Sequence, residues 1–273
     1  MSHMQNFAGK VVLITGASSG IGAALADEFA AQGATLILAA RRLALLNDIA
    51  QRLRTNGTIV HTYACDVTQD QSLQSLIADL ERQHIPLDIV VANAGFGVVG
   101  NVDRLSLADY QRQFDTNVFG VIRTAQAALP LLKRSRGVLA IVGSVVGHVA
   151  QPGASPYAMS KFAVRAFADS LRAESASEGV AVTLLSPGVV ESNLRRVDNQ
   201  GVFHPDAREP FPKWLRMPAA RAAQQMVRAI ARRKPEQIIT LHAKLAVWMS
   251  RYAPGLLRLV LRRGLRARPM VNK

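Results

Sequence analysis

Short apolar runs alternate with longer amphipathic stretches along most of this 273-residue chain. Several of the runs, such as residues 11–14, contain no polar residue, which is typical of strands buried on both faces of a parallel sheet. We expect strands at 11–14, 35–40, 59–65, 87–92, 138–142, 180–185 and 237–241. We expect helices at 23–32, 43–54, 72–83, 106–132 with a bend near 120, 156–174 and 219–232.

This regular alternation predicts an α/β fold, a Rossmann-type doubly wound parallel sheet in three layers, as a single domain over residues 7–240. In such folds, ligands bind at the carboxyl ends of the strands. Residues with useful chemistry follow six of the predicted strands directly. They are Gly16, Arg41, Asp66, Asn93, Ser144 and Pro187. One shared site at this edge of the sheet is therefore predicted.

After Pro187 the alternation loosens. Residues 195–218 contain four prolines together with Phe203, Phe211 and Trp214. A long irregular stretch inside a compact domain is usually a functional loop or a disordered one. Its aromatic content favours a lid over the substrate site, at about residues 190–218.

A glycine-rich turn follows the first predicted strand, with Gly16, Gly20 and Gly22. A strand, a glycine turn and a helix together favour a dinucleotide site, because the backbone can approach a pyrophosphate that the helix N-terminus stabilises. The glycine spacing differs from the G-x-G-x-x-G form, so this motif alone is a moderate signal.

Tyr157 and Lys161 lie four residues apart, on one face of the helix predicted there. Ser155 is expected to cap this helix, with Pro156 in its first turn. A nearby ammonium group favours the phenolate, so we expect Lys161 to lower the pKa of Tyr157 and make it a general acid or base. Taken alone, a Tyr-x-x-x-Lys pair is more often a tyrosine on the helix surface beside a solvated lysine.

Composition adds two constraints. The chain is 49% hydrophobic and 19% charged, which is typical of a globular protein, and its single cysteine, Cys65, cannot form an intrachain disulfide. We therefore expect a cytoplasmic protein, with or without peripheral membrane contact. Residues 1–3 resemble an expression-tag remnant.

The net charge of +14 is confined to the end of the chain, because residues 211–273 contain 15 Lys and Arg against one acidic residue. Residues 241–273 are predicted to form a basic amphipathic helical extension, broken at Pro254. Two interpretations stay open for it: contact with a membrane surface or substrate entrance, and packing on the body or on a partner subunit. No nucleic-acid partner is expected, because the apolar content is high.

Taken in order, the motifs resemble the short-chain dehydrogenase/reductase family over residues 7–240. They are Thr15-Gly16-x-x-x-Gly20-x-Gly22, Asp66, Asn93-Ala94-Gly95, Asn117, Ser144, Tyr157-x-x-x-Lys161 and Pro187-Gly188. The resemblance implies a homodimer or homotetramer. Ala92 and Ser192 depart from the family pattern, which often has Asn and Thr there, but neither change removes a catalytic group.

The resemblance implies four catalytic residues. Tyr157 would exchange a proton with the substrate oxygen, and Ser144 would hydrogen-bond that oxygen. Lys161 would also bind the nicotinamide ribose. Asn117 would hold a water linked to Lys161, although a helical Asn is also suited to satisfying buried backbone groups.

NADP(H) is the expected cofactor, because the second strand ends at Arg41 and Arg42, where an acidic residue would select NAD(H). NAD(H) is the less favoured choice, and no metal ion is expected. The cofactor site is expected at Gly16, Ser18, Ser19, Gly20, Ile21, Gly22, Arg41, Arg42, Asp66, Val67, Asn93, Ala94, Gly95, Tyr157, Lys161, Pro187, Gly188, Val189 and Ser192.

The sequence thus predicts an NADP(H)-dependent oxidoreductase for a hydrophobic carbonyl or secondary alcohol, such as a lipid, steroid or acyl compound. One alternative is a 3-oxoacyl-(acyl carrier protein) reductase, because a basic tail would attract an acidic carrier. Two alternatives without catalysis are an NADP(H)-binding regulator and a membrane-associated scaffold.

Overall fold

The computed structural model describes residues 7–207 and 209–265, so the predicted tag remnant at 1–3 and the end of the basic segment lie outside it. Seven strands form one parallel sheet in the order β3-β2-β1-β4-β5-β6-β7. They are β1 (Val11–Thr15), β2 (Thr35–Ala40), β3 (Val60–Ala64), β4 (Ile89–Ala92), β5 (Val138–Val142), β6 (Ala181–Pro187) and β7 (Glu236–Ile239). The predicted doubly wound α/β fold is confirmed.

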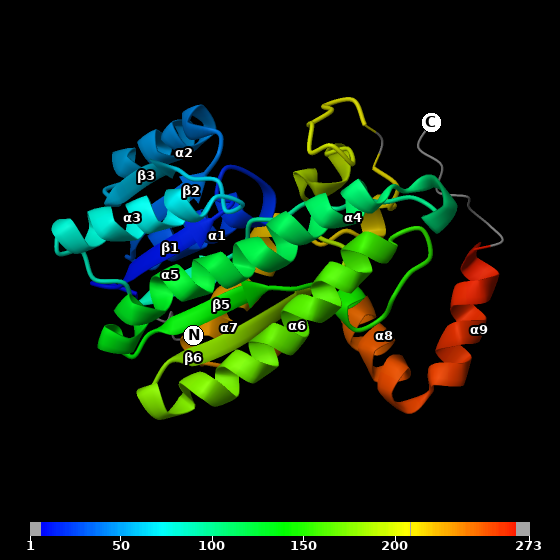
Figure 1. The fold of residues 1–273 in the computed structure, drawn as a ribbon. Helices are drawn as coiled ribbons and strands as arrows, with labels where there is room; N and C mark the ends of the chain where they lie inside the picture. The colour runs from blue at the N-terminus through cyan, green and yellow to red at the C-terminus, as the bar shows by residue number, and fades with distance from the viewer. Residues whose placement is uncertain (1–6, 208, 266–273) are drawn as a thin grey trace.

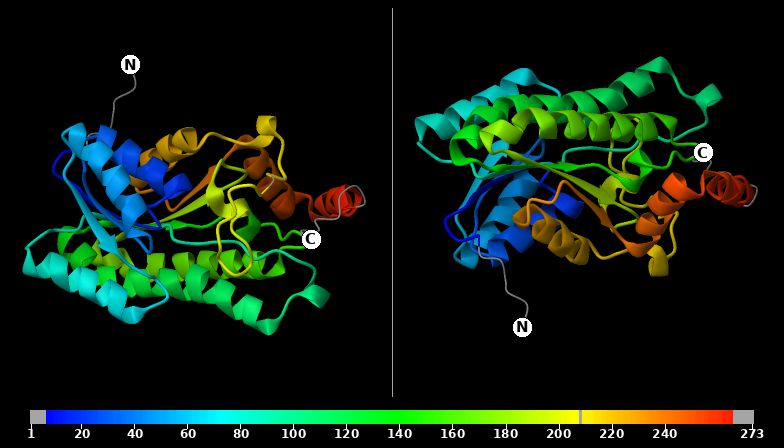
Figure 2. Two further views of the ribbon diagram at one scale, coloured as in Figure 1. Left: turned by 90° about the horizontal axis from the view of Figure 1, so that it is seen from above. Right: turned by 90° about the horizontal axis from the view of Figure 1, so that it is seen from below.

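Helices cover both faces of the sheet, as both views of Figure 2 show. One layer contains α1 (Gly20–Ala31), α2 (Leu43–Thr55) and α7 (Ala219–Ala231). The other contains α3 (Asp70–Arg82), α4 (Leu107–Phe114), α5 (Gly120–Ser135) and α6 (Ser155–Ser175). Alternate residues of β1 enter opposite cores: Val12 and Ile14 pack in one, and Val11 and Leu13 in the other. This two-sided burial explains the continuous apolar run.

The strand order reverses between β1 and β4, because β2 and β3 extend the sheet to one side and β5 to β7 to the other. The loops that follow β1 and β4 therefore turn toward opposite faces and leave a crevice between them. The predicted glycine turn and Asn93 lie on its two sides.

The helix predicted at 106–132 consists of α4, a π-helical turn η2 (Asp115–Phe119) and α5. Ser106 caps it in a reciprocal capping box with Asp109. The π turn inserts one residue per turn into the helical path and often occurs at functional sites. Here it contains Asn117 and adjoins the predicted bend near Gly120.

Several predicted boundaries differ from the observed ones by one to three residues, and two of the differences have a visible cause. Ser155 is the first residue of α6 rather than its N-cap, and its Oγ lies 2.7 Å from the hydroxyl of Tyr110 instead of on the helix backbone. Leu241, predicted to end the last strand, begins α8. Thr240 ends the strand with a positive φ of 81°, and its Oγ1 accepts from the N–H of Ala243 at 3.3 Å.

Two helices follow β7, namely α8 (Leu241–Tyr252) and α9 (Pro254–Leu265). They project from one end of the body in Figures 1 and 2. Within the described ranges, no helix is long and apolar enough to cross a membrane.

Candidate active site

A pocket of about 330 Å³ lies at the carboxyl ends of the central strands. The loops after β1, β2, β3, β4, β5 and β6 all contribute to it, together with η2, α6 and the segment after β6. It brings together all but one of the predicted site residues. These are Gly16, Ser18, Ser19, Gly20, Ile21, Gly22, Arg41, Arg42, Asp66, Val67, Asn93, Ala94, Gly95, Asn117, Ser144, Tyr157, Lys161, Pro187, Gly188 and Ser192.

The glycine turn is tied to the end of β4. Thr15 Oγ1 accepts from the N–H groups of Asn93 at 3.1 Å and Ala94 at 3.2 Å, and Asn93 Nδ2 donates to the Thr15 carbonyl at 2.9 Å. Gly16 has a φ of +66°, and a Cβ there would lie 2.7 Å from the Ala94 Cα. Only glycine fits this approach, and the N-terminus of α1 faces the pocket as a result, where an anionic phosphate is stabilised.

The end of β2 is cationic. Arg41 and Arg42 line the pocket and are exposed, and Arg42 Nη2 donates to Ser18 Oγ at 3.4 Å. Across from them, Asp66 Oδ1 accepts from the N–H of Thr68 at 3.0 Å and from its hydroxyl at 2.8 Å. The two exposed guanidinium groups can reach an anion at the pocket, whereas the Asp66 carboxylate is held by hydrogen bonds within its own turn.

Ser144 and Tyr157 meet at the inner end of the pocket. Ser144 is buried, and its Oγ accepts from the N–H of Val146 at 3.2 Å, which fixes the hydroxyl. Burial raises the pKa of Tyr157, and this effect outweighs a hydrogen bond from Ser144 and the positive charge of Arg195, which both lower it. The phenol is therefore protonated at neutral pH.

Lys161 lies beside Tyr157, as the four-residue spacing predicts. Its Nζ lies 5.8 Å from the centroid of the Tyr157 ring and donates to the Val142 carbonyl at 2.8 Å. Burial lowers the pKa of Lys161 to about 8. The pKa of Tyr157 is nevertheless raised overall, because burial outweighs the lowering effects of Ser144 and Arg195. The expected lowering of this pKa by Lys161 stays a prediction.

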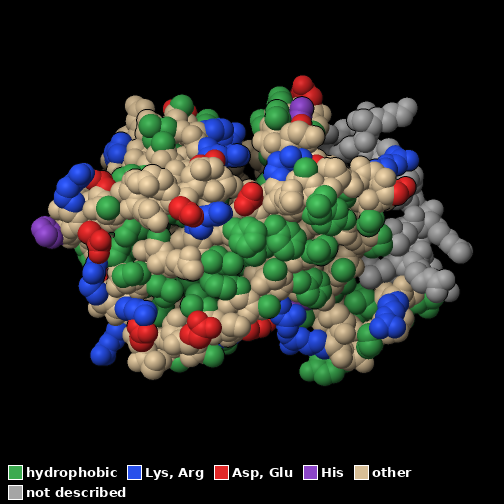
Figure 3. All heavy atoms as spheres, in the orientation of Figure 1, with side chains coloured by type: hydrophobic (Ala, Val, Ile, Leu, Met, Phe, Trp, Pro, Cys, Tyr) green, Lys and Arg blue, Asp and Glu red, His purple; other side chains and the backbone are tan. Residues whose placement is uncertain are grey.

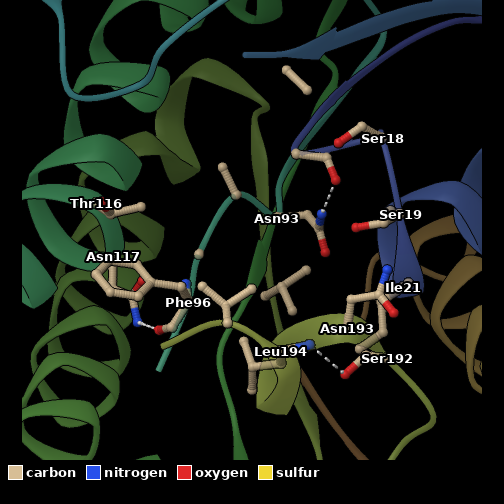
Figure 4. A pocket seen from close by; sticks show the side chains of 18 of the residues that line it. Ser18, Ser19, Ile21, Asn93, Phe96, Thr116, Asn117, Ser192, Asn193 and Leu194 are labelled. Carbon is tan, nitrogen blue, oxygen red and sulfur yellow. Dashed lines mark hydrogen bonds between the residues drawn. The ribbon is translucent and has the colours of Figure 1, made fainter. Parts of the chain in front are cut away.

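Asn117 is fully buried in the π turn, and its amide holds the loop after β4 (Figure 4). Its Oδ1 accepts from the N–H of Phe96 at 3.1 Å, and its Nδ2 donates to the Phe96 carbonyl at 3.0 Å and to Ser160 Oγ at 3.2 Å. Gln113 holds the same loop, through the Phe96 carbonyl at 2.8 Å and the N–H of Val98 at 2.6 Å. This is the backbone-satisfying role that the sequence left open for Asn117, and Gln113 was missed.

The segment predicted as a lid lies against the pocket, with short helices η5 (Asn193–Arg196) and η6 (Lys213–Leu215). Figure 4 shows Ser192, Asn193 and Leu194 on one side of the pocket. Asn199 holds the segment to the loop after β4, because its amide exchanges hydrogen bonds of 3.0 and 2.9 Å with the backbone of Val99.

Arg195 is a lid residue that sequence reasoning missed. It lines the pocket, pairs with Glu209 at 2.6 Å, and donates to the Val190 carbonyl at 2.9 Å. Its guanidinium also lies 5.3 Å from the Phe211 ring centroid. No sequence signal marked this arginine, because its partners Glu209 and Phe211 lie in the irregular stretch, where no regular spacing predicts contacts.

Val189 was predicted to line the pocket, but Val190 does so instead. The N–H of Val189 donates to His242 Nε2 at 3.1 Å, and burial lowers the pKa of that imidazole. A Cβ on Gly188 would lie 2.6 Å from the same nitrogen. The start of α8 thus supports the loop after β6, a contact that no local sequence pattern predicts.

Comparison with known proteins agrees with this geometry. A family model described as short chain dehydrogenase matches residues 10–202. Dehydrogenase/reductase SDR family member 7B of Danio rerio is 37% identical over 196 residues, which cover 69% of this chain and 63% of that protein. The 11-beta-hydroxysteroid dehydrogenase A of Sesamum indicum is 36% identical over 202 residues, covering 73% and 57%. The chain spans less than two thirds of the length of these relatives.

Two solved structures share the fold. One is an alcohol dehydrogenase from the archaeon Thermococcus sibiricus complexed with 5-hydroxy-NADP, with a TM-score of 0.74 and 29% identity over 84% of this chain and 95% of that one. The other is a short chain dehydrogenase/reductase from Burkholderia phymatum in complex with NAD, with a TM-score of 0.81 and 25% identity over 92% and 96%. These neighbours carry both kinds of nicotinamide cofactor.

Proposed function

The chain belongs to the short-chain dehydrogenase/reductase family, and we propose that it reduces a hydrophobic ketone or aldehyde with NADPH. The observation that carries the proposal is the convergence of Ser144, Tyr157 and Lys161 on one pocket with the glycine turn. A hydrogen-bond donor, a proton donor and a phosphate cradle are the protein groups that hydride transfer to a carbonyl needs.

The residues present fit a nicotinamide cofactor. Gly16 and Gly22 let the turn pack closely against the end of β4, because a Cβ on Gly22 would lie 2.7 Å from Asn93 Nδ2. This packing leaves the backbone of the turn lining the pocket without side chains over it. The glycine turn and the start of α1 would hold the pyrophosphate, and Asp66 the adenine end. When bound, the cofactor supplies the hydride.

Tyr157 then gives its proton to the substrate oxygen, while Ser144 donates a hydrogen bond to that oxygen. The raised pKa of Tyr157 keeps the phenol protonated at neutral pH, so it can donate its proton when the carbonyl is reduced. Lys161 places a cation near the phenolate that remains. Arg195 adds a second positive charge on the lid side. Asn117 acts as a positioning residue for the loop at Phe96.

The substrate is proposed to be hydrophobic because several large apolar side chains line the lid side of the pocket, beside the polar Ser192, Asn193 and Arg195. Its lining there includes Phe96, Val190, Leu194, Val197 and Phe203. A relative named for a hydroxysteroid is in keeping with this chemistry. A carrier-bound 3-oxoacyl group is the second candidate, favoured by the basic C-terminal segment.

NADP(H) is favoured over NAD(H) by Arg41 and Arg42, which are exposed at the pocket where β2 ends. A planar guanidinium binds the adenosine 2′-phosphate, and the segment has no acidic residue to bind a free 2′-hydroxyl.

We also propose a homo-oligomer. Figure 3 shows hydrophobic side chains gathered on the face over α5 and α6. On these elements, Phe119 at the end of η2 is 47% exposed, and Met159 and Phe162 of α6 are 50 and 41% exposed. Such a cluster of large apolar side chains is typical of a subunit interface.

The experiment that tests the reaction compares wild type with Tyr157→Phe on a panel of ketones, from short polar to long apolar, with NADPH. We expect the variant to bind NADPH normally and to lose turnover by about 10²- to 10⁴-fold, because only the proton donor is removed. Residual turnover within tenfold of wild type would exclude Tyr157 as the acid. Turnover of carrier-bound 3-oxoacyl substrates alone would favour the second candidate.

A further inference from the structure

Helix α8 carries large apolar side chains on its outward side. Leu241, Leu245, Trp248 and Tyr252 are 82, 56, 55 and 72% exposed, and their spacing of four, three and four residues places them along one side of the helix. We call these four residues the α8 face. The opposite side buries Ala243 and Val247 against the body. Packing on the body therefore accounts for the inner side of α8 and leaves the α8 face unexplained.

Two members of the α8 face are aromatic and amphipathic. The rings of Trp248 and Tyr252 lie 5.8 Å apart at a tilt of 41°. Tryptophan and tyrosine are enriched at membrane–water interfaces, where an apolar ring body and a polar tip each find a suitable medium. On α9, Leu256 and Leu259 add further exposed apolar surface at 54 and 44%.

Basic residues flank this apolar surface. Lys244 on α8 and Arg258 on α9 are both exposed. Residues 211–273 contain 15 Lys and Arg but one acidic residue, Glu236. That carboxylate is already engaged, with His148 Nε2 at 2.9 Å and Arg251 at 3.6 Å. This sequence segment therefore carries a large excess of positive charge over negative charge.

We propose that the α8 face docks on the surface of an anionic lipid bilayer. Apolar and interfacial aromatic side chains would enter the headgroup region, while Lys244 and Arg258 pair with lipid phosphates. A second copy of the chain fits less well, because it would bring two segments of the same strong positive charge together. The apolar cluster suited to a second copy lies elsewhere, over α5 and α6.

The docking face begins next to the active site. Leu241 precedes His242, whose Nε2 accepts from the N–H of Val189 in the loop after β6. A bilayer on the α8 face would lie close to the element that supports this loop. The docking itself depends only on α8 and α9, so it can be tested independently of the proposed reaction.

The test is co-sedimentation of the full chain with phosphatidylcholine vesicles, made with or without phosphatidylglycerol. We expect binding to the anionic vesicles only, weakened by added salt. Leu245→Ser with Trp248→Ser should lower the partition coefficient about tenfold or more, because two large side chains no longer leave water. Lys244→Gln with Arg258→Gln should lower it about tenfold as well. Ile59→Ser, which removes an apolar side chain 62% exposed at β3, is the matched control and should bind like wild type.

A fluorescence readout keeps the test independent of sedimentation and of activity. In a Trp214→Phe background, Trp248 is the one remaining tryptophan, since the chain has two. Its emission should shift to the blue on adding anionic vesicles. Unchanged emission, equal binding to neutral vesicles, or wild-type binding by the Leu245/Trp248 variant would each overturn the proposal. So would a loss of self-association, rather than of vesicle binding, in that variant.

Discussion

Lys161 holds its ammonium group where only 5% of the residue is exposed, and it donates to a neutral carbonyl rather than to a carboxylate. A buried cation without a counter-ion costs free energy, which is why burial lowers its pKa from 10.5 to about 8. Tyr157 beside it responds in the opposite direction, because burial disfavours its charged form too. Desolvation thus brings both groups toward their neutral forms.

The cost of this cation can be measured as stability. We expect Lys161→Met to raise the free energy of unfolding at neutral pH, because the variant no longer buries a cation. The gain is up to about 3 kcal/mol, reduced by the contribution of the lost hydrogen bond to the Val142 carbonyl. Because the folded-state pKa is lowered, the cost is fully present below pH 8 and fades as pH rises toward 10.5. The difference in free energy of unfolding between wild type and Lys161→Met should therefore shrink as the pH rises from 8 to 10.5.

Urea unfolding of both proteins, at neutral pH and near the upper end of the window, measures the difference. Lys244→Met, at an exposed lysine, is the control and should show no such convergence. Wild-type and Lys161→Met stabilities that stay parallel over the whole window would mean that Lys161 is not desolvated as described.

Cofactor choice also depends on single residues. Arg41→Asp replaces a cation at the end of β2 by an anion, which would repel a 2′-phosphate and bind a 2′-hydroxyl. We expect the ratio of kcat/KM for NADPH over NADH to fall about 10-fold or more, because charge-assisted hydrogen bonds are lost. Steady-state kinetics with both cofactors measure it, with Arg104→Asp, exposed and outside the pocket, as the control. An unchanged ratio would show that Arg41 does not bind the 2′-phosphate.

At the scale of elements, the strands could be predicted because their signal is local. In β1, residues 11–14 are each buried on one face or the other, so this run contains only apolar residues. The site residues at strand ends could be predicted once the strands were located, because the strands of a parallel sheet have their carboxyl ends at the same edge. Gly16, Asn93 and Ser144 all follow this rule.

The features that were missed depend on contacts between distant segments. The π turn exists where Gln113 and Asn117 both reach the Phe96 backbone, and nothing in the helix sequence specifies that partner. The position of the Arg195 side chain depends on its ion pair with Glu209, and the Val189 backbone depends on its hydrogen bond to His242. Ser155 could serve as a cap by type, yet Tyr110, 45 residues away, takes its hydroxyl. Tertiary partners decided each case.

The clamp formed by Gln113 and Asn117 allows a prediction at this scale. Asn117→Ala leaves the N–H of Phe96 without its acceptor, so we expect the free energy of unfolding to fall by about 1–3 kcal/mol. KM for NADPH should rise more than kcat falls, because the loop with Ala94 and Gly95 lines the cofactor side. Urea unfolding and steady-state kinetics measure the two effects.

A second substitution separates the clamp from general helix damage. Gln113→Ala combined with Asn117→Ala should be non-additive, because both amides donate to the Phe96 carbonyl. Gln111→Ala, on the exposed side of α4, should change neither measurement. Additive losses in the double variant would mean that the two side chains act separately.

At the scale of the whole molecule, two groups of exposed apolar side chains among the described residues differ in the charge of the sequence around them. The α8 face has basic neighbours, whereas Phe119, Met159 and Phe162 lie over the body, where residues 1–210 have equal numbers of basic and acidic residues. Neutral surroundings permit self-association, which a strongly charged face opposes. The two surfaces therefore point to different partners, a second copy of the chain and a lipid surface.

Self-association through the α5–α6 face can be tested without touching the pocket. We expect Phe162→Glu to raise the dissociation constant of the oligomer about 100-fold or more, because a carboxylate would be buried against an apolar partner surface. Light scattering during gel filtration, over a range of protein concentrations, measures the mass. Ile59→Glu places the same charge at the far edge of the sheet and should leave the mass unchanged. If Phe162→Glu keeps the mass of the wild-type oligomer and its circular dichroism spectrum, the subunit interface does not include this part of α6.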